Sequence, residues 1–281
     1  MALAAHTDDE RDLERLELEL LLEAIHQRYG YDFRGYARAS LRRRLWRRAD
    51  LEGLRSLSGL LERVLHEPEV MRELLADLSI NVTAMFRDPE FHRALRSDVF
   101  PLLRTHPFAR LWVAGCSTGE EVVSVAIALR EEGLLDRTLI YATDMDAQVV
   151  AAAKRGAFEL DKVREYTRTY VAAGGTGAFS DYYSVALGRA VFDPSLLADV
   201  VFAQHNLATD RSFNEFDVIL CRNVLIYFGR ELQDRVLGLF DSSLTRRGVL
   251  ALGRKETLAG TTLEPAYEPL DAAERIYRRR A

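Results

Sequence analysis

The sequence predicts an α/β fold that contains a small inserted β element and is preceded by an all-helical N-terminal domain. Three observations predict this fold class. Before residue 110, apolar residues recur at helical spacing and no strand-like alternation appears. From residue 110 onward, short apolar runs alternate with helical segments, which is typical of a parallel sheet covered on both faces. Between residues 156 and 199 that alternation stops, and short alternating pieces indicate a separate small sheet.

The N-terminal part of the chain is expected to hold helices only. Leucines between acidic residues mark the first helix, which should end near Tyr29 and Gly30. Glycines and Pro68 separate the helical patterns that follow. The predicted helices cover residues 8–28, 37–50, 54–66 and 68–80. We therefore expect a helical domain over residues 1–85.

The remainder of the chain, residues 86–281, is expected to form the α/β domain. Its predicted strands cover residues 111–114, 138–143, 200–205, 216–221, 248–252 and 275–278. Its predicted helices cover residues 119–132, 146–155 and 230–244. The small β insertion is expected at about residues 156–199, where alternating pieces such as 182–185 occur.

Composition excludes several classes of protein. The 281 residues are 48% hydrophobic, which is enough for a substantial core. No apolar run approaches the roughly 18–20 residues of a membrane-spanning helix, and no secretory signal opens the chain, so we expect a cytoplasmic protein without membrane insertion. Two cysteines, Cys116 and Cys221, are too few for a disulfide framework or a structural zinc site, so we expect reduced thiols and no metal. The net charge of −5 argues against a nucleic-acid partner.

The most informative motif follows the first strand of the α/β domain, which runs into Ala114. A turn bracketed by Gly115 and Gly119 opens a helix there, where an α/β fold presents its backbone to a nucleotide-like ligand. The turn lacks the spacing of a dinucleotide site, and Glu120 and Glu121 would repel a pyrophosphate while favouring a cation. The motif therefore favours S-adenosylmethionine, which carries a sulfonium and an ammonium, over NAD or ATP. The alternative is that both acids are ordinary first-turn helix residues.

The second strand of the α/β domain ends in Asp144. An acid at the end of the second strand is the usual partner for the ribose hydroxyls of an adenosine-containing cofactor. Asp146 is a rival for this role, and either residue could instead cap the following helix. The position at the strand end favours Asp144.

A polar pair, Arg222 and Asn223, follows the predicted strand at 216–221 directly. Ligands of such sheets bind outside the carboxyl ends of the strands, so this pair is expected to face the ligand. A solvated turn is the alternative. The segment 81–88 lies at the junction between the two domains and is either a lid over the ligand or an interdomain linker.

Charge is distributed unevenly along the N-terminal domain. Residues 1–23 hold eight acidic and two basic side chains, whereas residues 34–48 hold seven arginines and no acid. On a helix, the leucines of the arginine block would define one face, and three arginines would point largely the other way: Arg43, Arg44 and Arg47. This basic face is either a solvated helix surface or a docking site for an acidic partner.

Six ordered motifs give the chain a resemblance to a known family. They are Asn81-x-Thr83-x-x-Phe86-Arg87-Asp88-Pro89, residues 114–121, Ala142-Thr143-Asp144, His205-Asn206-Leu207, residues 221–228 and Leu252-Gly253. In these motifs the chain resembles the chemotaxis receptor glutamate O-methyltransferases of the CheR type across nearly its whole length. The resemblance implies a class I (Rossmann-like) S-adenosylmethionine-dependent methyltransferase domain with a small β subdomain, preceded in the chain by a helical N-terminal domain.

The resemblance also implies roles for individual residues. The implied cofactor-binding residues are Asn81, Thr83, Arg87, Ala114, Gly115, Glu120, Glu121, Asp144, Asn206, Leu207, Arg222 and Asn223. Asp144 would hold the ribose, and one acid of the pair at 120–121, which the motif does not single out, would face the amino-acid end of the cofactor. Arg87 and Tyr227 are the candidate catalytic residues, expected to orient the reacting carboxylate and the cofactor.

The implied reaction transfers the methyl group of S-adenosylmethionine to glutamate side-chain carboxylates of a chemoreceptor-like signalling protein, with S-adenosylhomocysteine as the second product. A glutamate carboxylate has a reference pKa of roughly 4.3, so it is ionised at pH 7 and needs neither a general base nor a metal. The implied partner is an acidic helical region of the acceptor, docked through Arg43, Arg44 and Arg47. The alternative is a cofactor-binding signalling scaffold with weak or no catalysis that acts with a sensor kinase.

Overall fold

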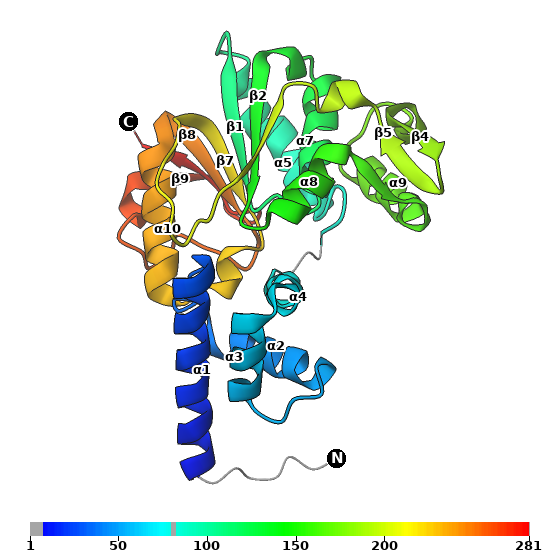
Figure 1. Ribbon diagram of the computed structural model, residues 1–281. Coiled ribbons are helices and arrows are strands. Elements are labelled where there is room, and N and C mark those ends of the chain that lie inside the picture. The colour runs from blue at the N-terminus through cyan, green and yellow to red at the C-terminus, as the bar shows by residue number, and fades with distance from the viewer. Residues whose placement is uncertain (1–7, 80–82, 281) are drawn as a thin grey trace. The chain divides into compact units, whose positions relative to one another are not determined.

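The computed structural model describes residues 8–79 and 83–280, and the chain divides into two compact units (Figure 1). The helical unit comprises the residues up to Ile80 together with Tyr227–Gln233. The sheet unit comprises Asn81–Ile226 and Asp234–Ala281. Each unit has its own core.

The elements follow one another as helices first and alternating strands and helices afterwards. The α-helices are α1 (Asp8–Tyr29), α2 (Arg38–Leu51), α3 (Leu57–His66), α4 (Pro68–Leu78), α5 (Pro89–Ala94), α6 (Phe100–Leu103), α7 (Glu120–Glu131), α8 (Ala147–Arg155), α9 (Val163–Ala172) and α10 (Arg230–Ser243). The strands are β1 (Ala109–Ala114), β2 (Thr138–Asp144), β3 (Ala157–Glu159), β4 (Tyr183–Ala186), β5 (Arg189–Phe192), β6 (Val200–Gln204), β7 (Phe216–Cys221), β8 (Leu244–Leu252), β9 (Tyr267–Asp271) and β10 (Ile276–Arg279).

The helical unit is held together by one apolar face of α1. Its buried residues recur at the helical period and are Leu18, Leu21, Leu22 and Ile25. This face packs against α3, whose start is capped by the Ser56 side chain accepting the Gly59 N–H at 3.1 Å. Full burial of a leucine or isoleucine stabilises the fold by about 1.5–3 kcal/mol relative to exposure, so this face contributes several kcal/mol to the unit's core.

Arg44 is buried, which corrects the prediction that it lies on the outward face of α2. Its Nη1 donates to the Leu78 carbonyl at 2.7 Å, and its guanidinium lies 4.9 Å from the centre of the Tyr227 ring. The reason is the helical period: position 44 is three residues after Leu41 and next to Leu45, so it falls on the leucine face. The prediction counted charge and overlooked this spacing.

The other arginines of the block differ in how they are paired. Four of them form ion pairs within the helical unit: Arg34 with Glu23 and Asp32, Arg38 with Glu19, Arg42 with Glu14, and Arg48 with Asp77. Arg43 and Arg47 are exposed and form no ion pair with any residue that the structure describes. These two arginines therefore carry the unneutralised charge of α2.

The segment Tyr227–Gln233 belongs to the helical unit by its contacts. An isolated antiparallel bridge joins Tyr36 to Phe228, and the rings of these two residues meet edge to face, 4.9 Å apart. The N–H of Ala37 donates to the Tyr227 carbonyl at 2.9 Å. A stretch that the sequence places directly after a central strand thus completes the helical unit.

The sheet unit is built on a seven-stranded sheet with the order β6-β2-β1-β7-β8-β10-β9. The pairs β6–β2, β2–β1, β1–β7 and β7–β8 are parallel, whereas β10 runs antiparallel to both β8 and β9. The expectation of a wholly parallel sheet is wrong at this end. The chain enters β10 directly from β9, which the sequence analysis did not predict, and a short connection can join only antiparallel neighbours.

Alternation along β1 separates the two faces of the large sheet. Leu111 and Val113 point to one face and share a single buried cluster with the apolar residues of α7. Trp112 points to the other face, where its ring lies 5.4 Å from Phe240 of α10. With helices on both faces, the parallel strands present their loops to the ligand only at their carboxyl ends.

A second, three-stranded antiparallel sheet with the order β3-β5-β4 lies within residues 157–192. Phe158 and Phe192 meet edge to face, with ring centres 5.5 Å apart, in the core beneath it. The same region contains α9, and residues 89–103 form α5, a π-helical turn and α6. The sequence analysis predicted none of these helices. With six and four residues, α5 and α6 are too short to show a period, and α9 lies inside the segment that was expected to be a β element.

Candidate active site

The loop that joins β1 to α7 is shaped by two glycines. Gly115 and Gly119 have φ values of +77° and +98°, in the left-handed region that favours glycine. A Cβ on Gly119 would lie 2.9 Å from the Cα of Ala153, so no larger residue fits against α8. The N–H groups of Gly115 and Cys116 both donate to the Thr143 carbonyl at 2.8 Å. The loop therefore holds the start of α7 at the carboxyl edge of the sheet, beside the end of β2.

Glu120, the first residue of α7, places a carboxylate in a buried position. The residue is only 4% exposed. Its carboxylate accepts hydrogen bonds from the Thr118 hydroxyl at 2.6 Å and from the Tyr166 hydroxyl at 3.4 Å. It forms no ion pair with the residues that the structure describes. A buried carboxylate with no cationic partner favours a positively charged ligand, because burial of an unpaired charge is costly.

Asp144 ends β2 and binds the backbone of two loops. Its Oδ2 accepts the Ser117 N–H at 3.0 Å, and its Oδ1 accepts the Asp146 N–H at 3.2 Å. Burial raises the pKa of the Asp144 carboxyl, and the backbone N–H groups partly oppose that rise. Each carboxylate oxygen keeps acceptor capacity for a further donor. The rival Asp146 instead caps α8, where its side chain accepts the Gln148 N–H at 2.8 Å.

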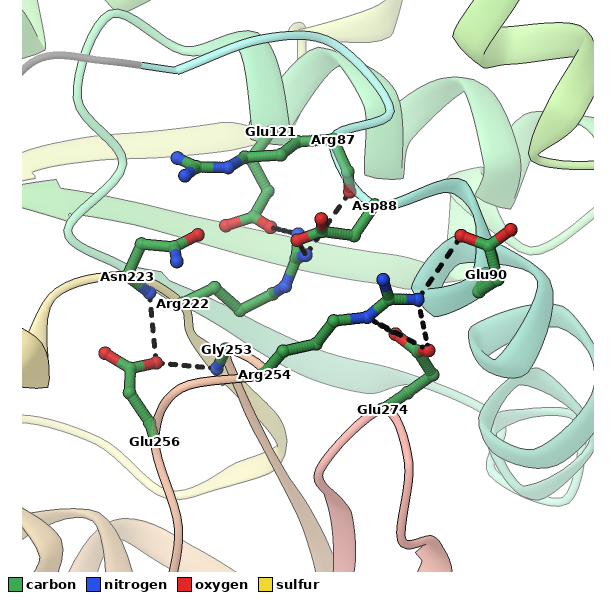
Figure 2. Close-up of polar contacts among 10 residues, drawn as sticks. All are labelled: Arg87, Asp88, Glu90, Glu121, Arg222, Asn223, Gly253, Arg254, Glu256 and Glu274. Atoms are coloured by element: carbon green, nitrogen blue, oxygen red, sulfur yellow. Dashed lines mark hydrogen bonds and ion pairs between the residues drawn. The ribbon is translucent and has the colours of Figure 1, made fainter.

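Arg222 joins three segments of the sheet unit, as Figure 2 shows. Its guanidinium forms ion pairs with Glu121 at 2.7 Å and with Asp88 at 2.6 Å. It also donates to the Arg87 carbonyl at 3.2 Å and lies 3.9 Å from the centre of the Phe91 ring. The Arg222 side chain is 3% exposed. One buried cation thus neutralises two carboxylates, and its loss would leave both without a partner.

Glu256 anchors the loops that follow β7 and β8 (Figure 2). Its buried carboxylate accepts backbone N–H groups from both loops, among them those of Gly253 at 2.6 Å, Asn223 at 3.0 Å and Val224 at 2.9 Å. Burial raises the pKa of Glu256, and these N–H groups oppose the rise. Asn223 has a φ of +60°, in the left-handed region, so the carboxylate holds this residue in an uncommon backbone conformation.

Arg254 ties the loop after β8 to two further acids (Figure 2). Its Nη2 lies 2.6 Å from a carboxylate oxygen of Glu274 and 3.3 Å from one of Glu90. The contacts of Arg254 with Glu274 and Glu90 hold one part of the loop, and the hydrogen bonds that Glu256 accepts from the backbone hold another. The backbone between Gly253 and Glu256 is therefore held from both directions.

The other described residues of the predicted cofactor set lie on the same sheet edge or on segments that lead to it. Ala114 is buried at the end of β1. Asn206 and Leu207 follow β6, where the Asn206 side chain accepts the Ala208 N–H at 3.0 Å and so shapes the turn. Thr83 lies in the segment that leads to Arg87, and the predicted residue Asn81 lies outside the described residues.

The two predicted catalytic residues have different surroundings. Arg87 contributes its carbonyl to the Arg222 network of the sheet unit. Tyr227 belongs to the helical unit, where its ring lies beneath the Arg44 guanidinium. The catalytic roles of Arg87 and Tyr227 stay predictions.

Sequence reasoning missed three residues that organise this edge. Asp88 stands next to the predicted Arg87 in the same motif, and its charge beside that basic residue was the available signal. Glu256 follows Gly253 by three residues, but nothing in a local pattern shows that its carboxylate reaches back to residues 223 and 224. Phe91 gave no signal, because an aromatic residue beneath a guanidinium is indistinguishable in sequence from a core residue.

The strand order with its single reversed strand, the glycine-shaped loop after β1 and the acids at the carboxyl edge define a class I S-adenosylmethionine-dependent methyltransferase fold. Residues 81–271 match the family described as CheR methyltransferase, SAM binding domain, and residues 16–79 match CheR methyltransferase, all-alpha domain. The chain therefore belongs to the CheR methyltransferase family.

Three curated relatives resemble this chain over most of its length. Cher3 of Pseudomonas putida, named provisionally as a methyltransferase, is 49% identical over 94% of this chain and 97% of its own length. Chemotaxis protein methyltransferase Cher2 of the same species is 32% identical over 77% of this chain and 81% of its own. Chemotaxis protein methyltransferase 1 of Pseudomonas aeruginosa is 31% identical over 76% of this chain and 80% of its own.

These matches confirm the family resemblance, the predicted fold class and S-adenosylmethionine as the cofactor. Within residues 8–79 and 83–280, no helix is long and apolar enough to span a membrane. The same residues contain no group of three or more His, Cys, Asp or Glu side chains arranged to hold a metal ion. Both cysteines are buried free thiols, and burial raises the pKa of each well above its ordinary value.

Proposed function

We propose that this chain methylates glutamate side-chain carboxylates of a chemoreceptor-like signalling protein, producing a glutamate methyl ester and S-adenosylhomocysteine. The family membership supports methyl transfer from S-adenosylmethionine. The glutamate acceptor, the chemoreceptor class and a cytoplasmic site of action are the specific parts of the proposal. The names of Cher2 and chemotaxis protein methyltransferase 1 support a chemotaxis protein as the acceptor, since both relatives are named for chemotaxis.

One observation supports the mode of cofactor binding most directly. Of the neighbouring acids Glu120 and Glu121, only Glu121 is neutralised by Arg222. Glu120 is buried without a cation among the described residues, so we assign it to the ammonium end of the cofactor. Asp144, with acceptor capacity left on both oxygens, would take the ribose hydroxyls. The acidity of this edge suits a positively charged ligand and disfavours a pyrophosphate.

The rest of the predicted set would enclose the cofactor. Asn206 and Leu207 would border the adenine, and Asn223 would complete the edge in the conformation that Glu256 imposes. Thr83 and Arg87 lie on the segment that would close over the ligand. In this proposal residues 1–85 and 86–281 act as the two domains, and the insertion at 156–199 is a subdomain of the second.

The chemistry needs positioning more than proton transfer. Bound S-adenosylmethionine supplies an electrophilic methyl group on its sulfonium. An acceptor carboxylate is already ionised at pH 7, so the chain's task is to hold it in line with the carbon–sulfur bond and to exclude water. We assign the orienting role to Arg87 and Tyr227, because a cation and a hydroxyl can each bind a carboxylate.

The proposal is tested by incubating the full chain with methyl-labelled S-adenosylmethionine and extract of the cells that encode it. Mass spectrometry of the labelled protein should show a methyl group on glutamate residues of a chemoreceptor-like protein. Arg87→Ala should lower the rate while leaving the thermal unfolding midpoint within a few degrees of wild type. Label on lysine, on nucleic acid or on a small molecule would contradict the proposal, and so would equal rates for wild type and the variant.

A further inference from the structure

The turn that carries Arg87 has an uncommon backbone conformation on both sides of that residue. Phe86 and Asp88 have φ values of +51° and +54°, in the left-handed region that favours glycine. An aromatic residue in this region is strained, and such a conformation persists only where surrounding contacts hold it. Because the two strained residues flank Arg87, the contacts that hold them also fix the direction of its side chain.

Three contacts with other elements of the sheet unit hold the turn from residue 86 to residue 88. The Phe86 N–H donates to Ser124 Oγ of α7 at 2.9 Å. The Arg87 carbonyl accepts from Arg222 at 3.2 Å, and the Asp88 carboxylate pairs with the same guanidinium at 2.6 Å. Figure 2 shows the Arg87 carbonyl facing Arg222 and the Arg87 side chain extending to another side.

A further contact, at the start of the turn, comes from Thr169 on α9. The Thr169 hydroxyl donates to the Met85 carbonyl at 2.9 Å. The carbonyls of Glu165 and Tyr166 also lie near this hydroxyl, each at 3.1 Å, but the hydrogen bonds of the helix already supply each of them with an N–H donor. A hydroxyl has only one proton to donate, and Met85 is the nearest of the three acceptors.

The same helix packs against the next residue of the turn. The rings of Phe86 and Tyr170 meet edge to face with their centres 5.3 Å apart, and both residues are fully buried. Since Thr169 and Tyr170 are adjacent, one turn of α9 holds both Met85 and Phe86. Helix α9 lies between β3 and β4 in the chain, so the insertion itself supports the turn that carries Arg87.

We infer that Thr169 is a positioning residue for methyl transfer: its hydroxyl holds the Met85 carbonyl, and the strained turn that follows directs the Arg87 side chain. The inference rests on the proposed role of Arg87 in orienting the acceptor. Thr169 acts through the backbone of the turn and touches neither cofactor nor acceptor. Loss of its hydroxyl should therefore lower the rate of transfer and leave the cofactor affinity unchanged, because misplacement of an orienting group by about 1 Å is costly to the rate.

The test compares Thr169→Val, which removes the hydroxyl and keeps the shape, with Thr169→Ser, which keeps the hydroxyl. Total label transferred from saturating methyl-labelled S-adenosylmethionine to extract of the cells that encode the chain gives the rate, whatever group accepts the methyl. Thr169→Val should be slower by about three- to tenfold, and Thr169→Ser should recover most of that loss. Calorimetry should show no change in the cofactor Kd. The matched control is Thr167→Val, which removes a hydroxyl that donates within the same helix to the Val163 carbonyl at 2.9 Å, and it should behave as wild type.

The same substitution in an Arg87→Ala chain separates positioning from a structural role. If Thr169 acts through Arg87, Thr169→Val should change the rate of that chain by less than about twofold. An equal fold loss with and without Arg87 would overturn the inference, and so would a wild-type rate in Thr169→Val. A wild-type rate in Arg87→Ala would overturn both the proposed role of Arg87 and the inference. The predicted ratios with label that is stable in alkali would support the inference and contradict only the glutamate acceptor.

Discussion

The carboxyl edge of the large sheet and the α2 helix both concentrate charge, but they use it in opposite ways. At the sheet edge, Arg222 is buried and neutralises Glu121 and Asp88. On α2, Arg43 and Arg47 are exposed and unneutralised by any described residue. A buried charge fixes the geometry of its neighbours and is costly to unpair, whereas an exposed charge acts on partners at a distance and costs the fold little. Charge counted in sequence therefore says little until burial is known.

The largest effect is expected from Arg222→Ala. Two carboxylates at the sheet edge would lose their common partner, and breaking a buried ion pair costs about 3–5 kcal/mol of unfolding free energy. Urea unfolding should show this loss, together with loss of cofactor binding. The paired control Arg43→Ala/Arg47→Ala should stay within about 0.5 kcal/mol of wild type. Equal losses of unfolding free energy in Arg222→Ala and in the control would contradict the distinction between the buried charge of the sheet edge and the exposed charge of α2.

Glu120→Gln tests which of the two neighbouring acids at the sheet edge binds the cofactor. The substitution keeps the shape and removes the buried negative charge, so the affinity for S-adenosylmethionine should fall by about 1.5–3 kcal/mol, roughly ten- to a hundredfold. Calorimetric titration measures this change. Glu121→Gln should instead lower the unfolding midpoint more than Glu120→Gln does, because Glu121 pairs with Arg222. A larger affinity loss in Glu121→Gln would reverse the assignment of the two acids.

Glu256→Ala should alter the loops after β7 and β8 and leave the contacts of Glu120 and Glu121 in place. The backbone N–H groups of Gly253, Asn223 and Val224 would lose their acceptor, and each buried unsatisfied donor costs about 1–3 kcal/mol. Cofactor affinity and the thermal unfolding midpoint should both fall, and Glu256→Gln, which keeps one carbonyl oxygen, should fall between wild type and alanine. Wild-type cofactor affinity in the alanine variant would show that the conformation of Asn223 does not matter for binding.

Reversal of the exposed charges on α2 is expected to weaken recognition of the acceptor protein and to leave cofactor binding unchanged. Arg43→Glu/Arg47→Glu should raise the KM for the protein acceptor several-fold and leave the cofactor Kd unchanged. The rate at limiting acceptor should fall with ionic strength for wild type and less steeply for the variant, since steering by exposed charges is screened by salt. Arg55→Glu reverses another exposed arginine and is the control. The same acceptor KM in all three proteins would make these arginines a solvated surface only.

The smallest expected effect is a shift in pH dependence. Burial raises the pKa of Asp144 above its ordinary value, so its carboxylate gains a proton at a higher pH than an exposed aspartate, whose pKa is about 3.9. As the pH falls through that raised pKa, hydrogen bonds from the ribose hydroxyls should weaken and the cofactor Kd should rise. Asp144→Asn should bind more weakly at pH 7 and show a flatter pH profile. A profile that is unchanged in Asp144→Asn would assign the titration to another group.

Local patterns predicted the elements that have long periods or long apolar runs. The helices of the N-terminal domain, the parallel strands and the acid at the end of β2 all follow from spacing within a few residues. Two features escaped prediction. One is β9, and with it the reversal of β10 that the short connection from β9 imposes; the other is the reach of Glu256 to residue 223, which depends on a contact between residues far apart in the sequence. Arg44 is the instructive error, because its burial follows from a period that the sequence displays. The prediction followed the charge of Arg44 and ignored its spacing from Leu41.

The most direct test of the proposed methyl transfer is the alkali stability of the transferred label. Acceptor protein is methylated by this chain with methyl-labelled S-adenosylmethionine, purified, and treated with dilute alkali, and the volatile label is counted. A glutamate methyl ester hydrolyses to methanol, so nearly all of the label should become volatile, and none should transfer in the absence of the chain. Label that stays bound to the acceptor in alkali would show methylation of nitrogen or carbon and would contradict transfer to a carboxylate.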